Sequence, residues 1–185
     1  MKVFHIGYQK TGTSTYEQVY KTLGYNLFDR LAVGTKHYNL LQRYKESLDF
    51  DLLLPIIEDH TAFADNPWFW RIHDKLHATC PDAKFVLTTR DSDKWFDSLK
   101  AGHMRMDPRV RWALYNGFKP SEENRRLYKS IFDNYNNDVR SYFEDRHNFI
   151  EINIDESPDW QTICDFLDKT VPNKPFPWLN KRKSK

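Results

Sequence analysis

The residues with the clearest chemical potential lie between positions 5 and 15, in a short loop bounded by two glycines. A Walker A phosphate-binding loop has the pattern G-x-x-x-x-G-K-[ST], and Gly7 and Gly12 stand at the spacing of its two glycines. Thr13 occupies the place of the Walker lysine, and the lysine of this loop is Lys10 instead. This displacement argues against an ordinary ATPase or kinase and favours binding of a different phosphate-bearing donor.

The neighbouring residues predict that the loop joins a strand to a helix. Residues 3–6 form a short apolar run of β type, and a helical repeat of apolar residues starts at Thr13 and closes at Gly24. Backbone N–H groups and the positive end of the helix dipole meet at such a junction, and both attract anions. A turn without function is the alternative, but one lysine and four hydroxyl residues in the same loop disfavour it.

A second element carries an arginine and a serine that could bind another phosphate. Residues 84–91 read as a buried strand with a polar end, and Asp91 or Ser92 caps the helix that follows. Arg90 ends the strand, and Ser98 lies eight residues later in the helix. A guanidinium offers two parallel hydrogen bonds to a phosphate, and a hydroxyl adds a neutral donor. A surface ion pair of Arg90 with Asp91 or Asp93 is the alternative.

Together these segments resemble the sulfotransferases that use 3′-phosphoadenosine 5′-phosphosulfate (PAPS). Lys10-Thr11-Gly12-Thr13-Ser14 resembles their K-[ST]-G-T-[ST] loop, which holds the 5′-phosphosulfate, and Arg90 and Ser98 match the pair that binds the 3′-phosphate. Residues 82–96 and the ending Pro175-Phe176-Pro177-Trp178-Leu179-Asn180 resemble a group of sulfotransferase-like proteins more specifically. The resemblance implies the following donor-binding residues: Lys10, Thr11, Gly12, Thr13, Ser14, Thr15, Arg90 and Ser98.

The resemblance implies transfer of a sulfuryl group from PAPS to a hydroxyl or amine, with adenosine 3′,5′-bisphosphate as the other product. The ammonium of Lys10 would stabilise the charge that grows on the leaving phosphate. Cytosolic members use a histidine as the general base, two residues ahead of a proline, and here Asp65 stands at that place before Asn66-Pro67. Asp65 is therefore the first candidate for the base, and His60 and Glu58 are alternatives. Asp65 as a turn or capping residue remains open.

The pattern of elements predicts one α/β domain over residues 1–185. Its expected architecture is a three-layer, P-loop-like fold, with a central parallel sheet between layers of helices. Further expected strands are residues 26–28, 61–65 and 148–154. The first expected helix covers residues 35–48, and the second carries Trp68, Ile72 and Leu76 on one face. The third is capped by Ser121 and carries Leu127, Ile131, Tyr135 and Val139 on one face. The fourth begins at Ser157-Pro158. Ligands of such sheets bind beyond the carboxyl ends of the strands, where the Lys10 loop, Asp65 and Arg90 should converge.

Composition limits the possible partners. The formal net charge of +2 comes from 28 basic and 26 acidic residues, so it gives no reason to expect nucleic acid. No apolar stretch approaches the length of about 20 residues that spans a bilayer, and the chain starts directly with a strand, so we expect a cytoplasmic protein without a membrane partner. No histidine or cysteine spacing indicates a metal site. The acceptor is expected to be a small molecule or carbohydrate, contacted by residues 30–60 and 101–120, and the oligomeric state is not predicted.

Two other functions remain open. A nucleotide kinase or NTPase with a degenerate P-loop would need a carboxylate for Mg²⁺ after a hydrophobic strand, and Asp91 is the residue available for that role. A module that binds the nucleotide without catalysing a reaction is the other possibility. Metal-independent preference for adenosine 3′,5′-bisphosphate separates the sulfotransferase from the first alternative, and turnover separates it from the second.

Overall fold

The protein, described by a computed structural model over residues 1–102, 108–115 and 117–179, is built on a parallel sheet. The strands are β1 (Val3–His5), β2 (Ala62–Phe63), β3 (Lys84–Thr89) and β4 (Phe149–Asn153), in the spatial order β2-β1-β3-β4. Val3 pairs with Ala62 on one side and with Lys84 on the other, and Phe85 pairs with Phe149. All described strands run in the same direction, so their carboxyl ends meet at one edge of the sheet.

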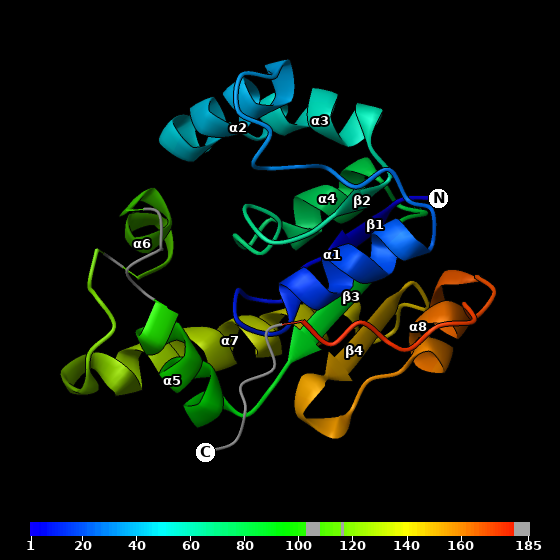
Figure 1. Cartoon of the computed structure of the whole chain (residues 1–185). Coiled ribbons are helices and arrows are strands. Elements are labelled where there is room, and N and C mark those ends of the chain that lie inside the picture. Colours follow the sequence, from blue (N-terminus) through cyan, green and yellow to red (C-terminus); the bar gives the residue numbers. More distant parts are fainter. Residues whose placement is uncertain (103–107, 116, 180–185) are drawn as a thin grey trace.

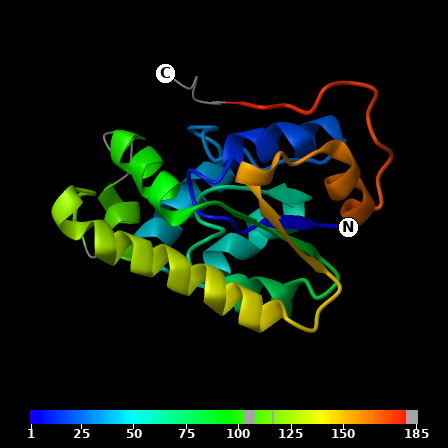
Figure 2. The ribbon, with the colours of Figure 1, turned by 90° about the horizontal axis from the view of Figure 1, so that it is seen from below.

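Alternating side chains of the strands feed two hydrophobic clusters, one on each face of the sheet. Phe4, Phe85 and Leu87 belong to the larger cluster, whereas Val3 and Val86 belong to the smaller one. Helices α1 (Thr13–Thr22) and α8 (Trp160–Leu167) cover the smaller cluster, and α4 (His73–Thr79), α5 (Ser92–Gly102) and α7 (Arg125–Phe143) pack on the larger. Figure 2 shows α7 along one face of the sheet with α1 and α8 on the other. The predicted three-layer α/β architecture with a parallel sheet is confirmed.

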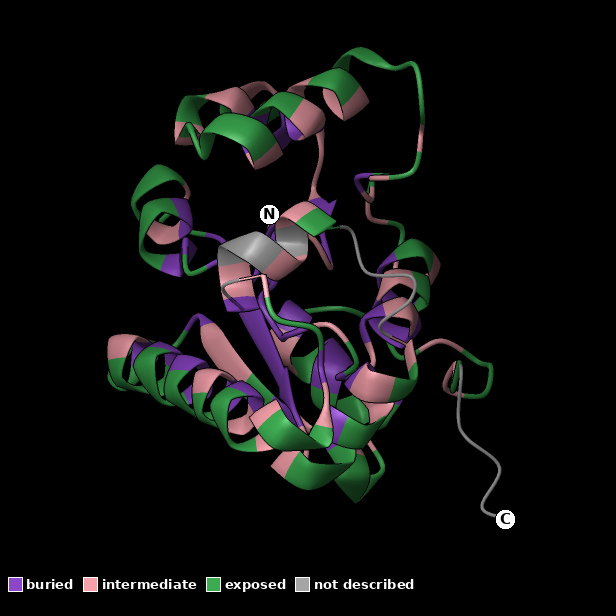
Figure 3. Cartoon of the chain, turned by 90° about the vertical axis from the view of Figure 1, so that its left-hand side faces the viewer, coloured by how far each residue is buried: buried purple, intermediate pink, exposed green. Residues whose placement is uncertain are grey.

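Further helices lie above the β2 side of the sheet and, in the case of the last one, beside α5. They are α2 (Lys36–Ser47), the short 3₁₀ turn η1 (Phe50–Leu53), α3 (Leu54–Asp59) and α6 (Pro108–Tyr115), and Figure 1 shows them above and beside the sheet. The Arg109 guanidinium of α6 donates a hydrogen bond of 2.7 Å to the Gln42 amide of α2. Strands β1, β2 and β3 are almost entirely buried, whereas β4 is mostly of intermediate burial, and Figure 3 shows exposed outer faces on the helices. No helix among the described residues has the length and apolar character needed to cross a membrane.

Local patterns predicted several elements well. The strand over residues 84–89, the helix from Ser92 and the helix after Gly12 lie where expected, and Thr35 caps α2 by accepting from the Tyr38 N–H. Residues 26–28 form only a single bridge, between Leu27 and Ala62, instead of the expected strand. Asp159, rather than Ser157-Pro158, caps α8 by accepting from the Thr162 N–H, because Ser157 has a positive φ of 56°.

Two helix predictions need correction. The helix expected to carry Trp68, Ile72 and Leu76 begins only at His73, because Arg71 has a φ of 56° that a right-handed helix does not accept. All three apolar residues are buried nevertheless. A 3₁₀ turn, η3 (Glu122–Asn124), separates Ser121 from α7. The predicted face of α7 is confirmed in part: Tyr135 and Val139 are buried as expected, whereas Leu127 is 37% exposed. The other buried residues of this helix are Tyr128, Phe132, Asn136 and Phe143.

Candidate functional site

A cavity of about 910 Å³ lies at the carboxyl edge of the sheet. Its walls come from the loop between β1 and α1, the segments that follow β2, β3 and β4, one face of α5, and residues 178–179. Lys10, Asp65, Arg90 and Ser98 all line it, although they are far apart in the sequence. The structure therefore brings together the residues that the three sequence segments predicted.

The backbone of the glycine-bounded loop is shaped to receive an anion. Lys10 and Gly12 have positive φ angles of 71° and 90°, and Gly12 is the N-cap of α1. The first turn of α1 contains no acidic residue, and Thr13 and Ser14 line the cavity. The first N–H groups of a helix have no partner inside the helix and carry part of its positive dipole. This end of α1 therefore suits a phosphate or sulfate group.

The ammonium of Lys10 reaches across the cavity to the end of α5. A Cβ atom placed on Gly102 would lie 2.9 Å from Lys10 Nζ, so any larger residue there would displace the ammonium. The carboxyl end of a helix carries a partial negative charge that attracts a cation. The side chain thus lies between the anion-binding end of α1 and the last turn of α5, where a charge developing in the cavity would meet it.

Two hydroxyls of the loop have structural partners: that of Thr11, which does not line the cavity, and that of Thr15, which does. The buried Thr11 hydroxyl donates to the Tyr8 carbonyl at 2.5 Å and lies 2.7 Å from the Thr88 hydroxyl. The Thr15 hydroxyl accepts a 3.1 Å hydrogen bond from the Leu179 N–H, which ties the C-terminal segment to α1. The expectation that the Thr11 hydroxyl holds the phosphate is therefore corrected, because that hydroxyl is bonded within the protein to the Tyr8 carbonyl and the Thr88 hydroxyl.

Arg90 extends from the end of β3 to the same loop. Its Nη1 donates to the Lys10 carbonyl at 3.3 Å, and its Nη2 lies 3.5 Å from Asp155 Oδ1. Nε is buried and has no hydrogen-bond partner among the described residues. The ion pair is thus formed with Asp155, which follows β4, and not with Asp91 or Asp93 as the alternative interpretation held. A buried guanidinium N–H without a partner fits a phosphate oxygen as its missing acceptor.

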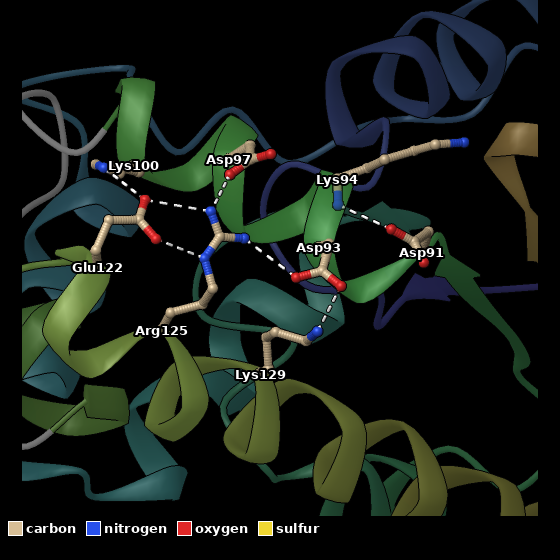
Figure 4. Close-up of polar contacts among 8 residues, drawn as sticks. All are labelled: Asp91, Asp93, Lys94, Asp97, Lys100, Glu122, Arg125 and Lys129. Carbon is tan, nitrogen blue, oxygen red and sulfur yellow. Dashed lines mark hydrogen bonds and ion pairs between the residues drawn. The ribbon is translucent and has the colours of Figure 1, made fainter.

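An ion-pair network holds α5, which contributes Ser98 to the cavity, against the first turns of α7 and the η3 turn before it. Arg125 contacts Asp93 at 3.1 Å, Asp97 at 2.6 Å and Glu122 at 2.7 Å, and Lys129 contacts Asp93 at 2.6 Å. Figure 4 shows the Arg125 guanidinium surrounded by these carboxylates. The pKa of Glu122 is lowered to about 2, mainly by its hydrogen bonds from Arg125 and Lys100. The network is exposed to solvent, so its effect is to orient α5 more than to stabilise the fold.

Asp65 is held by an arginine that sequence reasoning missed. The Arg30 guanidinium donates to Asp65 Oδ2 from Nη2 at 2.6 Å and from Nε at 3.2 Å, and both residues line the cavity. Asp65 Oδ1 accepts from the Asn66 N–H at 2.9 Å. Glu17 of α1 lies 3.8 Å from Arg30, and burial raises the pKa of its carboxyl. Arg30 was expected only as part of an acceptor-contacting segment, because no local pattern marks its pairing with Asp65.

The alternative bases lie at the opposite edge of the sheet. Glu58 and His60 precede β2, and their backbone carbonyls accept from the ammonium of Lys2, which precedes β1. The His60 ring nitrogen Nδ1 bonds to the Ile56 carbonyl at 2.9 Å. Neither residue lines the cavity. They are therefore removed from the list of candidate bases, whereas the role of Asp65 stays a prediction. Among the described residues, no cluster of His, Cys, Asp and Glu is arranged to hold a metal ion.

Comparison with known proteins agrees with this geometry. The sulfotransferase domain family matches over two overlapping segments, residues 2–123 and 103–185. The chain belongs to the sulfotransferase domain family. A curated relative, Ava biosynthesis cluster protein M of Aspergillus versicolor, is 27% identical over 216 residues, an alignment that covers 97% of this chain and 80% of the relative. Membership of this family indicates that the protein is a transferase enzyme.

Two solved structures of deoxyadenosine kinase from M. mycoides also align with the sulfotransferase domain. One holds dATP and the other holds the products dCMP and dCDP, with TM-scores of 0.44 and 0.45 and sequence identities of 12% and 9%. Each alignment covers 91% of this chain and 97% of the kinase chain. Likeness at this level carries no argument about the activity of the present chain.

Proposed function

We propose that the protein transfers a sulfuryl group from PAPS to a hydroxyl or amine of a small-molecule or carbohydrate acceptor. One observation carries this proposal: Lys10 and Arg90, from segments 80 residues apart, line one cavity, and Arg90 Nη1 donates to the Lys10 carbonyl. Two cations held at a fixed distance suit a donor with charged groups at both its 5′ and 3′ positions. PAPS supplies the activated sulfuryl group, and the residues of this chain bind, orient and neutralise charge.

Lys10 acts on the charge that develops during the transfer. The N–H groups at the start of α1 and the Ser14 hydroxyl bind the 5′-phosphate and sulfuryl oxygens. As the bond to sulfur breaks, negative charge grows on the leaving phosphate oxygen, and the Lys10 ammonium stabilises it more than it stabilises the ground state. Positioning and charge neutralisation account for catalysis here, as in phosphoryl transfer.

Arg90 and Ser98 bind the 3′-phosphate. The partnerless Nε of Arg90 and the hydroxyl of Ser98 are the donors, and Asp155 keeps the guanidinium in place through its contact with Nη2. A phosphate oxygen that accepts from Nε would form a charge-assisted hydrogen bond while Asp155 stays at Nη2. This pair gives the site its preference for a nucleotide with a 3′-phosphate.

Trp178 supplies a platform for the nucleobase. Its side chain is 38% exposed and lines the cavity beside Ile154 and Leu179, which form the apolar part of the wall. Phe176 anchors the same segment by packing on Tyr16 of α1 and Trp160 of α8. An exposed indole in a nucleotide-sized cavity is suited to stacking against a purine.

Asp65 receives the proton of the acceptor, and Arg30 positions it. Oδ1 of Asp65 bonds only to the neighbouring Asn66 N–H in the described structure, whereas Oδ2 is held by two guanidinium hydrogen bonds. Oδ1 is therefore the oxygen with capacity to accept an acceptor proton. The half-buried Arg30 side chain sets the direction of the carboxylate.

Calorimetry tests the donor site directly. Wild-type protein, Lys10→Ala and Arg90→Met are titrated with adenosine 3′,5′-bisphosphate and with ATP, each with and without Mg²⁺. We expect metal-independent binding with a preference for the bisphosphate, and weaker binding by both variants. A preference for Mg-ATP would overturn the proposal in favour of a kinase or NTPase. Tight bisphosphate binding, with no turnover of PAPS across phenol, amine and sugar acceptors, would favour the binding module.

A further inference from the structure

A chain of polar side chains lies buried beneath the glycine-bounded loop. His5, at the end of β1, is fully buried, and its ring contacts the Tyr20 hydroxyl through Nδ1 at 3.2 Å and the Thr88 hydroxyl through Nε2 at 2.9 Å. Thr88 in turn lies 2.7 Å from the Thr11 hydroxyl, which donates to the Tyr8 carbonyl. The chain connects α1, β1 and β3 to the middle of the loop.

The protons of this chain have one possible arrangement. A carbonyl only accepts, so Thr11 uses its single O–H on Tyr8 and must accept from Thr88. Thr88 has then used its own proton and must accept from His5 Nε2–H, which leaves His5 Nδ1 to accept from the Tyr20 hydroxyl. Burial lowers the pKa of His5 to about 3 and raises that of Tyr20 well above 10.0, so the ring is neutral and the phenol keeps its proton.

The glycine-bounded loop passes very close to Thr88 of β3, so the hydrogen-bonded side chains beneath it contact the loop directly. A Cβ atom at Gly7 would lie 2.2 Å from the Thr88 hydroxyl oxygen, so only glycine allows the loop to pass over Thr88. The Thr11 N–H also donates to the Tyr8 carbonyl, at 3.3 Å, so side chain and backbone of Thr11 hold the same acceptor. These two hydrogen bonds to the Tyr8 carbonyl thus hold the turn that presents the anion-binding N–H groups.

We propose that Tyr20, His5 and Thr88 form a one-way chain of hydrogen bonds that positions the anion-binding loop, with His5 fixed as the neutral Nε2–H tautomer. The chain touches neither donor nor acceptor, so its members are positioning residues that act through Thr11. The inference rests on the proposed function only in that the loop binds the phosphate of the donor. The tautomer itself can be tested without any ligand.

Nitrogen NMR of protein labelled with ¹⁵N-histidine reads the tautomer. The protein has seven histidines, and the set of signals that disappears in His5→Gln belongs to His5. We expect a protonated Nε2 and an unprotonated Nδ1, unchanged from pH 5 to pH 8. A protonated Nδ1, or a ring that titrates in this range, would overturn the proposal whether or not the protein binds PAPS.

Binding measurements test the positioning role. Thr88→Val removes the hydroxyl and keeps the shape, Thr88→Ser keeps the hydroxyl, and Thr89→Val is the matched control. Thr89 is also buried and donates at 2.9 Å, but to Glu151, away from the loop. At a temperature where each variant is fully folded by circular dichroism, we expect Thr88→Val to bind adenosine 3′,5′-bisphosphate about fivefold to tenfold more weakly, as loss of one or more hydrogen bonds predicts. Thr88→Ser and Thr89→Val should stay within about twofold of wild type, below the effect of one lost hydrogen bond.

The outcomes separate this inference from the proposed function. Unchanged affinity in Thr88→Val, or an equal loss in Thr89→Val, would overturn the positioning role, because the effect would then be absent or general. If wild type does not bind the bisphosphate, the proposed function fails, and inorganic sulfate becomes the probe of the loop in the same three variants. Equal sulfate affinity in Thr88→Val and wild type would then overturn the inference as well.

Discussion

The sides of the cavity that we propose for the donor and for the acceptor are built in different ways. The loop around Lys10 is closed by hydrogen bonds among buried groups, which include Thr11, Thr88 and His5. Asp65, in contrast, is held by an ion pair with Arg30, and both side chains are partly exposed. Buried hydrogen bonds fix a geometry closely, whereas a partly exposed pair can rearrange around different molecules. We therefore expect the proposed donor side to hold one geometry and the proposed acceptor side to adapt to different molecules.

The largest effect is expected from Lys10→Ala. This variant removes the charge that we propose stabilises the leaving phosphate, so turnover of PAPS should fall on the order of 1000-fold, as for loss of a key electrostatic donor. Formation of adenosine 3′,5′-bisphosphate in the presence of an acceptor measures it. Lys21→Ala, a lysine in the last turn of α1 outside the cavity, serves as the control and should retain full turnover. Full turnover by Lys10→Ala would remove it from the catalytic role.

Asp65→Asn should lower turnover by about 100-fold while adenosine 3′,5′-bisphosphate binds with unchanged affinity. The reason is that the amide keeps the shape of the carboxylate but does not take up the acceptor proton. Arg30→Met should show a smaller loss of turnover, because the carboxylate remains but loses its orientation. Glu17→Gln is the control, since Glu17 touches Arg30 without lining the cavity. If Asp65→Asn weakens bisphosphate binding instead, Asp65 belongs to the donor side.

Arg90→Met should abolish the preference for a 3′-phosphate. Loss of charged hydrogen bonds worth about 1.5–3 kcal/mol should weaken adenosine 3′,5′-bisphosphate binding by about tenfold to a hundredfold. Calorimetry should find little change for adenosine 5′-phosphosulfate, which lacks that group. Lys94→Met provides the comparison, because Lys94 contacts the same Asp155 but is 61% exposed. Equal losses for both nucleotides would mean that Arg90 supports the loop rather than the 3′-phosphate.

The buried His5 should make stability depend on pH. Its pKa is about 3 in the folded protein and about 6.5 when unfolded, so the unfolded chain binds the extra proton between these values. The contribution of His5 is therefore complete above pH 6.5 and is lost as the pH falls toward 3, at about 1.4 kcal/mol per pH unit. Urea unfolding between pH 4.5 and pH 7.5 measures this slope. His5→Gln should reduce it, and an identical slope in that variant would contradict the buried neutral ring.

The smallest effect is expected from Arg125→Met in the network of Figure 4. Its partners Asp93, Asp97 and Glu122 are exposed, so water and salt already weaken these ion pairs. Thermal unfolding should show a slightly lower midpoint at low ionic strength, with the difference from wild type disappearing at high salt. A large loss that persists at high salt would show that the packing of the guanidinium on Phe96, at 4.5 Å, matters more than its charge.

The sequence predicted the elements whose signals are local. The strand over residues 84–89 and the turn into α1 were recognisable because hydrophobic runs, glycines and capping residues lie next to one another. The start of α4 was wrong because the positive φ of Arg71 leaves no mark in the residue pattern. The buried face of α7 was predicted only in part, because Tyr135 and Val139 are buried as expected but Leu127, from which the helical phase was set, is 37% exposed.

The same distinction applies to the candidate site. Lys10, Arg90 and Ser98 could be placed because each belongs to a short motif beside a strand. The pairings of Arg30 with Asp65 and of Arg90 with Asp155 join segments 35 and 65 residues apart, so tertiary structure alone determines them. Asp155 could have been anticipated, because it lies two residues after the end of β4 and the carboxyl ends of parallel strands share an edge.

The position of Trp178 also gives the protein a built-in optical reporter. Trp68, Trp70, Trp95 and Trp160 are at most 7% exposed, whereas Trp178 is 38% exposed and lines the cavity. Its fluorescence should emit at longer wavelength than that of the buried indoles and be quenched by iodide. A nucleotide stacked on the indole should shield it from iodide, so unlabelled compounds can be screened for occupancy before any acceptor is known.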